Sequence, residues 1–226
     1  MTTDKPDRAD CCLPDARIAT HFDQRVRDQL ADGALPAMVA VSRELLDLLA
    51  DVGERRPTVL ELGSGSGGLS VALLERGAAA ADGIDLSPES VATARRRAEA
   101  AGVADRATFT VGDAAQVPLT GHDWVVIDRV ICCYAHVGPL LANAIGAATE
   151  RIAFSLPESS GWRGLVTRFF VTLENATDRF RPRPCPNFIH DVRKIEARLT
   201  AAGFMLVRDA RTSMWYLAVW DRPPAA

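Results

Sequence analysis

Lysine is nearly missing from this chain, which carries only Lys5 and Lys194 among its 226 residues. Arginine supplies most of the positive charge, and 26 basic residues against 29 acidic ones leave a net charge of −3. We expect no nucleic-acid partner, because nucleic-acid-binding domains concentrate positive charge on one face. The scarcity of lysine also excludes Schiff-base chemistry from most of the chain, since that chemistry needs a lysine amine.

Long apolar runs are also missing. The chain has no stretch of the roughly 18 apolar residues that a membrane-spanning helix needs, so we expect no membrane span. Its start, MTTDKPDRADCC, is polar and lacks the apolar segment of a secretory signal. We therefore expect a cytoplasmic protein. With 48% hydrophobic and 24% charged residues, the composition is typical of a soluble globular domain.

Cysteine is sparse and unevenly placed. Zinc ligands are usually separated by about two to four residues, whereas four of the five cysteines here form two adjacent pairs. The spacing therefore does not predict a zinc site, and we expect no bound metal. In a cytoplasmic chain we expect reduced thiols. The cysteines are Cys11, Cys12, Cys132, Cys133 and Cys185.

Strand and helix patterns alternate along the chain. Short apolar runs predict strands at residues 58–63, 81–87, 106–113, 122–130 and 151–157, with two more after residue 203. Helical spacing and capping signals predict helices at residues 22–30, 36–49, 69–76, 88–102, 139–150, 162–180 and 191–202. This alternation predicts a doubly wound α/β fold. We expect a seven-stranded, mostly parallel sheet with a C-terminal antiparallel hairpin and an N-terminal helical cap.

A glycine-rich loop, ELGSGSGG, joins the first predicted strand to the helix that follows it. Glycine permits a tight turn and lets a ligand approach the backbone N–H groups at the helix start. Gly63, Gly65 and Gly68 fit the G-x-G-x-x-G fingerprint of dinucleotide-binding proteins. Gly67 completes a second pattern, E-x-G-x-G-x-G, that begins at Glu61. The loop alone predicts a nucleotide-containing cofactor without choosing between these two patterns.

Missing motifs weaken the dinucleotide interpretation. A short-chain dehydrogenase needs Tyr-x-x-x-Lys, and neither Tyr134 nor Tyr216 has a lysine four residues later. No G-K-[ST] sequence is present, which excludes a P-loop. Asp85 lies 20 residues beyond Gly65, where a carboxylate holds ribose hydroxyls in either cofactor class. An NAD(P)-binding oxidoreductase stays an alternative.

Acidic residues follow one another at the ends of successive predicted strands, namely Glu61, Asp85, Asp113 and Asp128. Together with the E-x-G-x-G-x-G loop, this set resembles the class I S-adenosylmethionine-dependent methyltransferases over roughly residues 55–155. The resemblance implies a Rossmann-like enzyme with S-adenosylmethionine as cofactor. It also implies methyl transfer to a small-molecule acceptor.

The resemblance further assigns roles to individual residues. It implies that the loop glycines approach the amino-acid part of the cofactor, and that Asp85 holds the ribose. It places Asp113 at the adenine amine and Asp128 beside the amino-acid end. The expected cofactor-binding residues are Glu61, Gly63, Ser64, Gly65, Gly67, Asp85, Leu86, Asp113, Ala114 and Asp128.

A narrower resemblance rests on CCLPDA, DRVICCYAH, FSLP and a late IHD…GF…W. These segments are similar to small bacterial proteins labelled magnesium-protoporphyrin O-methyltransferase-like. Those proteins typically carry Val-Cys-Cys-Tyr-Pro after the fourth strand and His-Pro before the last helix. Here Ala135 and Asp191 replace the two prolines.

The resemblance divides the chain into two parts. Residues 1–55 are expected to form a flexible segment and helical cap, and residues 56–226 the methyltransferase domain. Residues 156–190 are expected to be a substrate-side insertion, because ligands of such sheets bind at the carboxyl ends of strands. Within this segment, Trp162, Phe169 and Phe170 are expected to form the wall of a substrate cavity, or else core.

The segment RVICCYAH follows the fourth predicted strand, on the substrate side. Neighbouring side chains of an extended segment point to opposite sides, so we expect one cysteine in the core and one at the cavity. We expect His190 to be neutral, because a helix start follows it. No catalytic residue is assigned. The substrate-side candidates are Cys132, Cys133, Tyr134, His136 and His190.

Two further functions remain alternatives at this point. One is a non-catalytic module that only binds the cofactor. The other is a thiol-based metalloid methyltransferase, because clustered thiolates bind soft ions.

Overall fold

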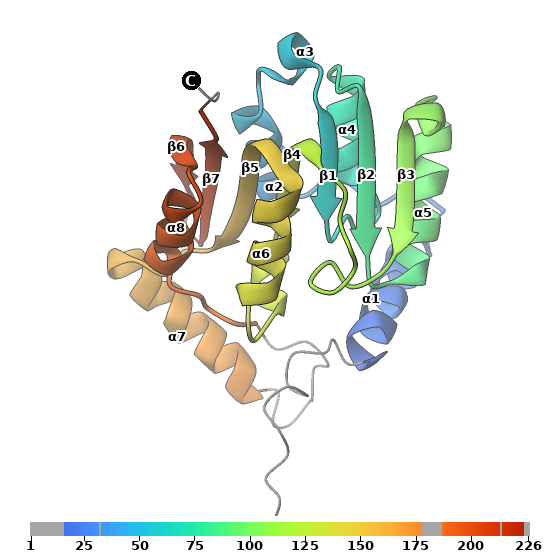
Figure 1. The fold of residues 1–226 in the computed structure, drawn as a ribbon. Coiled ribbons are helices and arrows are strands. Elements are labelled where there is room, and N and C mark those ends of the chain that lie inside the picture. The colour runs from blue at the N-terminus through green and yellow to red at the C-terminus, as the bar shows by residue number, and fades with distance from the viewer. Residues whose placement is uncertain (1–15, 32, 178–186, 213, 224–226) are drawn as a thin grey trace, which may run out of the picture.

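The computed structural model describes residues 16–31, 33–177, 187–212 and 214–223, which form a seven-stranded sheet with helices on both faces (Figure 1). The strands are β1 (Thr58–Leu62), β2 (Ala80–Asp85), β3 (Ala107–Val111), β4 (His122–Asp128), β5 (Ala148–Pro157), β6 (Met205–Arg211) and β7 (Trp215–Asp221). The helices are α1 (Ala16–Gln29), α2 (Ala40–Leu48), α3 (Val52–Arg55), α4 (Gly68–Glu75), α5 (Pro88–Ala100), α6 (Gly138–Ala147), α7 (Gly161–Thr177) and α8 (Val192–Ala201), with 3₁₀ turns η2 (Ala104–Arg106) and η3 (Ile131–Cys133).

The sheet has the strand order β3-β2-β1-β4-β5-β7-β6. Strands β1 to β5 are parallel to their neighbours, whereas β7 runs antiparallel to both β5 and β6. The dinucleotide-binding order is 3-2-1-4-5-6, so this sheet differs by a reversed last strand inserted before β6. The predicted doubly wound sheet with a C-terminal hairpin is confirmed.

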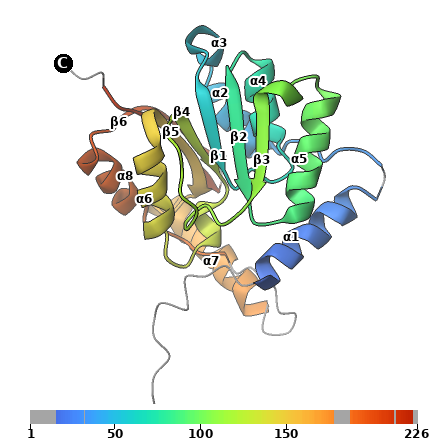
Figure 2. The same ribbon diagram turned by 45° about the vertical axis from the view of Figure 1, so that its right-hand side comes forward.

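Helices cover both faces of the sheet (Figure 2), and apolar side chains pack between the sheet and the helices on each face. Trp124 and Val126 of β4 belong to the layer that packs with α2, α4 and α5. Val125 and Ile127 belong to the opposite layer, which packs with α6 and α8. This alternation follows from the two-residue repeat of a strand. Because helices cover both faces, the strand ends are the places where a ligand can approach the sheet.

Most predicted elements are confirmed, with small shifts at their ends. Ser87 caps α5 by accepting a hydrogen bond from the Ser90 N–H at 2.9 Å, and Asp191 caps α8. The helix predicted to reach residue 150 ends at Ala147, because Ala148 already pairs with β4. The short helix α3 was not predicted. The expected flexible start, with Cys11 and Cys12, and the Pro-rich segment with Cys185 lie outside the described residues.

The two N-terminal helices have different positions. Helix α2 belongs to a core layer, where Val41 and Leu45 are buried. Helix α1 lies beside α5 at the carboxyl end of the parallel strands (Figures 1 and 2). The Asp23 carboxylate of α1 accepts hydrogen bonds from the Ser87 hydroxyl at 2.5 Å and the Glu89 N–H at 3.1 Å. These contacts hold α1 at the edge where ligands of such sheets bind.

Helix α7 presents its large apolar side chains outward. Its buried face consists of Gly164, Thr167 and Val171. A side chain at Gly164 would collide with the Ser159 backbone, so this close approach requires glycine. The predicted core role of the aromatic residues here is therefore wrong. Trp162 and Phe170 line a separate cavity with Met214, and their contact with a substrate stays a prediction. The exposed apolar residues of α7 are Trp162, Leu165, Val166, Phe169, Phe170 and Leu173.

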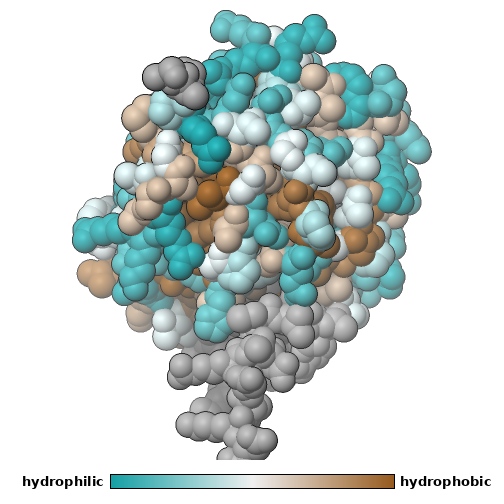
Figure 3. All heavy atoms as spheres, viewed as in Figure 1, coloured by the Kyte–Doolittle hydropathy of each residue, from teal (hydrophilic) through white to brown (hydrophobic). Residues whose placement is uncertain are grey.

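Among the described helices, none is both long enough and apolar enough to cross a membrane. In the orientation of Figure 1, hydrophilic side chains gather at the upper end of the molecule, away from the carboxyl ends of β1, β2 and β3 (Figure 3).

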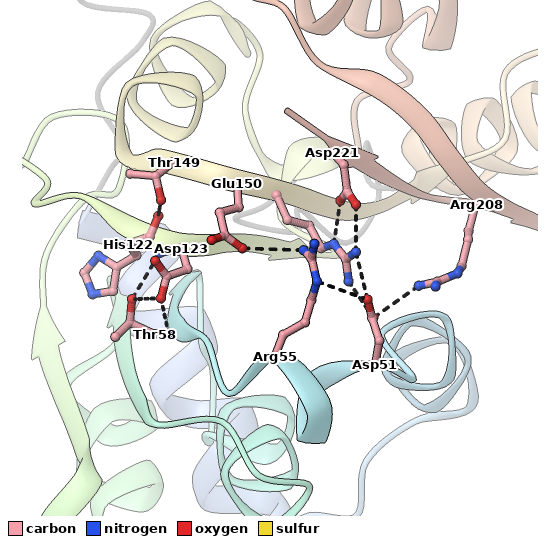
Figure 4. A network of polar contacts seen from close by, with 10 residues as sticks. Asp51, Arg55, Thr58, His122, Asp123, Thr149, Glu150, Arg208 and Asp221 are labelled. Carbon is pink, nitrogen blue, oxygen red and sulfur yellow. Dashed lines mark hydrogen bonds and ion pairs between the residues drawn. The ribbon is translucent and has the colours of Figure 1, made fainter. Parts of the chain in front are cut away.

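A buried arginine, Arg151, ties three segments together near the amino end of β5, and Figure 4 shows its carboxylate partners Asp51 and Asp221. Arg151 is 2% exposed and donates two hydrogen bonds to Asp221, at 2.6 and 2.8 Å, and two to Asp51, at 2.7 and 3.1 Å. Its guanidinium carbon lies 4.3 Å from the centre of the Trp124 ring. Arg208 adds a 3.2 Å hydrogen bond to Asp51. The two carboxylates compensate for burying the cation.

The Asp51 carboxylate is expected to make stability depend on acid pH. Burial opposes its ionisation, but the hydrogen bond and charge of Arg151 outweigh burial and lower the pKa of Asp51 from 3.8 to about 2. Folding therefore favours the ionised form, and this stabilisation is complete above about pH 4 and lost toward about pH 2. The loss should be about 2 kcal/mol in the free energy of unfolding.

Urea unfolding at a series of pH values measures this effect. The Asp51→Asn variant should be less stable at pH 7 and should lose less stability between pH 4 and pH 2. Asp47→Asn is the matched control, because the Asp47 side chain is 68% exposed. If wild type and Asp51→Asn lose the same free energy of unfolding between pH 4 and pH 2, the assignment of the effect to Asp51 is contradicted.

Candidate functional site

A cavity of about 590 Å³ lies at the carboxyl ends of β1, β2 and β4. The loop after β1 contributes Gly65, and Asp85 and Asp128 come from the ends of β2 and β4. Helix α1 contributes Phe22 and Arg25. Small-molecule sites usually have volumes of about 300–1,000 Å³, so this cavity is large enough to hold a ligand.

Three loop glycines have positive φ angles, of 77° at Gly63, 51° at Gly65 and 74° at Gly67. A side chain at Gly63 would overlap Val130, and one at Gly67 would come within 2.8 Å of the Ala94 Cβ on α5. A side chain at Gly65 would meet no protein atom within 4 Å. Gly63 and Gly65 line the cavity, whereas Gly67 does not. Gly67 therefore serves helix packing, and Gly65 leaves space for a ligand.

Hydrogen bonds hold this loop in place. The N–H groups of Gly63 and Ser64 both donate to the Ile84 carbonyl, at 2.7 and 3.0 Å. Arg97 on α5 donates from Nε to the Ser66 carbonyl at 2.7 Å. Ser64 lines the cavity, and its hydroxyl is buried without a hydrogen-bond partner among the described residues. Because buried hydroxyls normally have partners, a ligand that bonds to this group would satisfy it.

Asp85 joins the end of β2 to the glycine loop. Its carboxylate accepts hydrogen bonds from the Gly65 N–H at 2.8 Å and the Ser87 N–H at 2.9 Å. Burial raises the pKa of Asp85, and the two N–H donors act against that rise. Asp85 lines the cavity beside Leu86, and its predicted contact with a ribose stays a prediction.

Glu61 is buried at the inner end of the cavity. Its carboxylate accepts hydrogen bonds from both the N–H (3.0 Å) and the hydroxyl of Ser70 at the start of α4. Burial raises the pKa of Glu61 to about 8 against these hydrogen bonds, and the charges of Asp128 and Asp85 add to the rise. The inner cavity is therefore rich in carboxyl groups that a cation would stabilise in their ionised form.

Asp128 ends β4 and lines the same region of the cavity. Its carboxylate accepts hydrogen bonds from the Ser42 hydroxyl and from the Ser155 hydroxyl, the latter at 2.5 Å. The Arg129 Nε lies 3.5 Å away. Ser42 on α2 was not predicted, because the sequence offers no signal that brings it beside a residue 86 positions later.

Asp113 differs from the other predicted acids. It does not line the cavity, although its neighbours Gly112 and Ala114 do. Its carboxylate accepts hydrogen bonds from the Tyr134 hydroxyl at 2.6 Å and from the Gln116 amide at 2.6 Å. The predicted contact of Asp113 with an adenine amine stays a prediction, and its oxygens already have partners in the protein.

The paired cysteines lie in η3 rather than in an extended segment. Arg129, with a φ of 58°, turns the chain after β4, and the thiols of Cys132 and Cys133 both donate to its carbonyl, at 3.6 and 3.8 Å. Cys132 is buried and Cys133 is half-buried, and both line the cavity. The prediction that one of them points away is wrong, because side chains in a 3₁₀ turn do not alternate as they do in a strand.

The two candidate histidines occupy different positions relative to the cavity. His136 is exposed and lines the cavity, whereas His190 does not line it. The His190 Nε2 lies 2.8 Å from the Tyr134 carbonyl. Burial lowers the pKa of His190 despite its hydrogen bonds to the Tyr134 and Ile131 backbone, and the charge of His136 adds to the lowering. Its neutral form is therefore favoured by burial rather than by the helix start.

Comparisons with known proteins agree with this geometry. Residues 59–153 match the family described as "Methyltransferase domain". The magnesium protoporphyrin IX methyltransferase from Synechocystis PCC 6803, crystallised with bound SAH, superposes with a TM-score of 0.59 at 20% identity, over 92% of this chain and 84% of that one. The described part of the chain has the fold of the class I S-adenosylmethionine-dependent methyltransferases, and residues 59–153 are similar to a methyltransferase domain. S-adenosylmethionine is the cofactor of this class.

Other similar proteins show that the fold alone does not identify the reaction or the substrate. A ribosomal protein L11 methyltransferase from Erwinia tasmaniensis is 49% identical over 108 residues, which are 48% of this chain and 32% of that protein. The chain spans about a third or less of the curated relatives it matches. The [4+2]-cyclase SpnF superposes with a TM-score of 0.68 at 14% identity, covering 94% of this chain and 97% of that one. The fold therefore supports more than one chemistry.

The methyltransferase cavity fits S-adenosylmethionine on observations of this structure. Gly65 leaves open space beside the backbone, and the buried Ser64 hydroxyl has no hydrogen-bond partner among the described residues. Glu61, Asp85 and Asp128 line the same space, and a cationic sulfonium would stabilise the ionised form of these carboxyl groups. When bound, the cofactor supplies a methyl group already activated by the positive charge on its sulfur.

The outer part of the cavity contains residues that sequence reasoning missed. Phe22 and Arg25 of α1 line it together with Asn187 and Phe188, which precede α8. The Phe188 N–H donates to the Cys132 carbonyl at 2.8 Å and so holds this segment beside η3. No local pattern could have found these residues, because they meet only when distant segments fold together.

The Tyr134 hydroxyl is expected to position the loop after β3 in the methyltransferase domain. Burial and the hydrogen bond to Asp113 raise the pKa of Tyr134, so the phenol stays protonated and donates. Tyr134→Phe should lower the free energy of unfolding by about 1–2 kcal/mol, because the bond to a charged partner is lost. Thermal and urea unfolding measure this loss. Tyr216 makes a similar bond to Glu196 away from the cavity, so Tyr216→Phe is the comparison for the size of this loss in stability. A Tyr134→Phe variant as stable as wild type would contradict the proposal.

Proposed function

We propose that this protein transfers the methyl group of S-adenosylmethionine to a small-molecule acceptor. The observation that carries the proposal is that both sides of the reaction meet in one cavity. The glycine loop, Asp85 and Asp128 line its inner part, and Phe22, His136 and Phe188 line the substrate side.

The residues of the inner part bind and orient the donor. Asp85 is held by the Gly65 and Ser87 N–H groups, which fixes its carboxylate at the loop for contact with ribose hydroxyls. Asp128, held by two serine hydroxyls, flanks the amino-acid end. Such preorganisation aligns the reacting atoms without reorganising the protein during the reaction.

The substrate side favours an acceptor with an apolar body. Helix α1 contributes Ile18, Phe22 and Val26 to the cavity, and Phe188 faces it from the segment before α8. These side chains exclude water from the transfer position. His136 lines this side of the cavity and would accept the proton that the acceptor loses. Arg25 is placed to attract an anionic group.

Two measurements test this function. Titration calorimetry should detect binding of S-adenosylhomocysteine and no binding of NADH; binding of NADH alone would overturn the proposal. Radiolabelled S-adenosylmethionine is then incubated with the protein and a cell extract separated into small-molecule and protein fractions. Label should pass to the small molecules. Transfer into the protein fraction alone would favour a protein acceptor, as the names of the L11 relatives suggest, and would overturn the small-molecule assignment.

A further inference from the structure

The proposed reaction gives no role to the two cysteine sulfur atoms, although both residues line the cavity. The Cys132 and Cys133 thiols reach the same oxygen atom, the carbonyl of Arg129, at 3.6 and 3.8 Å. Because they share this acceptor, the two sulfur atoms lie no more than 7.4 Å apart. A single ligand entering the cavity can therefore reach both.

The backbone explains why adjacent side chains converge here. In a strand, neighbouring side chains point to opposite faces, and only one of these cysteines would face the cavity. The positive φ of Arg129 turns the chain out of β4, and η3 begins two residues later. A 3₁₀ turn has about three residues per turn, so adjacent side chains point about a third of a turn apart and both remain on the cavity side.

The number of sulfur donors selects the kind of ligand. Thiolates prefer soft ions, and structural zinc takes about four ligands. No cluster of three or more histidine, cysteine, aspartate or glutamate residues suited to a metal occurs in the part of the chain that the structure describes. Two sulfurs match a trivalent organic arsenical, which forms two bonds to sulfur and keeps its third bond to carbon.

We propose that Cys132 and Cys133 form a dithiol site that binds a trivalent arsenical through both sulfur atoms inside the cavity. With an arsenoxide, two arsenic–sulfur bonds replace the two S–H bonds and the arsenic–oxygen bond. Both thiol protons leave with the oxygen as water, and the oxidation state of arsenic does not change. The site is independent of methyl transfer, since binding needs no methyl donor.

Phenylarsine oxide is the probe for this site. The full chain is incubated with it under native conditions, and the adduct is quantified by mass spectrometry and mapped by digestion. We expect an adduct at residues 132–133. Cys132→Ser and Cys133→Ser each keep a hydroxyl donor for the Arg129 carbonyl and remove only the sulfur. Each should weaken binding at least about tenfold, because the second arsenic–sulfur bond forms within one complex.

The other cysteines serve as controls. The Cys11→Ser/Cys12→Ser double variant and Cys185→Ser should keep the adduct at residues 132–133. The proposal is overturned by any of three results: no adduct at these residues, an adduct that survives in both single variants, or an adduct that also requires Cys11 and Cys12. Thermal unfolding checks each variant. If the buried Cys132→Ser variant does not fold, the half-buried Cys133→Ser carries the test.

Discussion

Replacing Gly65 with alanine should remove most of the affinity for S-adenosylhomocysteine and leave the domain folded. The new Cβ would meet no protein atom within 4 Å, and it would project into the cavity from the glycine loop. It would therefore occupy space that the ligand needs next to the backbone. We expect at least a tenfold increase in Kd, a loss of about 1.4 kcal/mol or more, measured by titration calorimetry. The φ of 51° adds a backbone cost of about 1–2 kcal/mol.

Gly63→Ala is the matched control for this experiment. Its Cβ would overlap the Val130 side chain at a φ of 77°, so this substitution is expected to destabilise the folded state. We expect Gly63→Ala to lower the thermal midpoint more than Gly65→Ala does, because overpacking costs about 1–3 kcal/mol. If Gly65→Ala binds S-adenosylhomocysteine as tightly as wild type, the ligand does not approach this part of the loop.

Asp85→Asn is expected to weaken S-adenosylhomocysteine binding about 10- to 100-fold, since hydrogen bonds to a charged group contribute about 1.5–3 kcal/mol. The carboxylate is the group proposed to accept from the ribose, and it also positions the Gly65 N–H at 2.8 Å. An asparagine keeps one oxygen but turns the other acceptor into a donor. Titration calorimetry at a fixed ionic strength measures the change.

Asp82→Asn is the matched control for charge. Asp82 lies on the same strand, but its carboxylate accepts a hydrogen bond from the His122 Nε2 at 3.0 Å, and Asp82 does not line the cavity. This variant should bind S-adenosylhomocysteine with wild-type affinity. Equal losses in both variants would mean that the negative charge of β2 acts at a distance, and that Asp85 makes no specific contact.

The sequence by itself determined the fold and most of the inner cavity. The alternating patterns predicted the parallel strands, and Ser87 and Asp191 capped the helices as expected. Gly65 and Asp85 lie at the cavity as predicted. These features were readable because they depend on local physics: periodicity decides which side chains are buried, and caps satisfy N–H groups a few residues away.

Only the tertiary structure decided how distant residues meet. It paired Asp113 with Tyr134, 21 positions away, and packed Gly67 against Ala94 of α5. It turned the large side chains of α7 outward because Gly164 permits a close approach on the opposite face. It also brought both cysteines of η3 to the cavity, because the φ of Arg129 and a 3₁₀ turn replaced the extended backbone that the pattern predicted. Such outcomes depend on the packing of whole elements, which a local pattern does not encode.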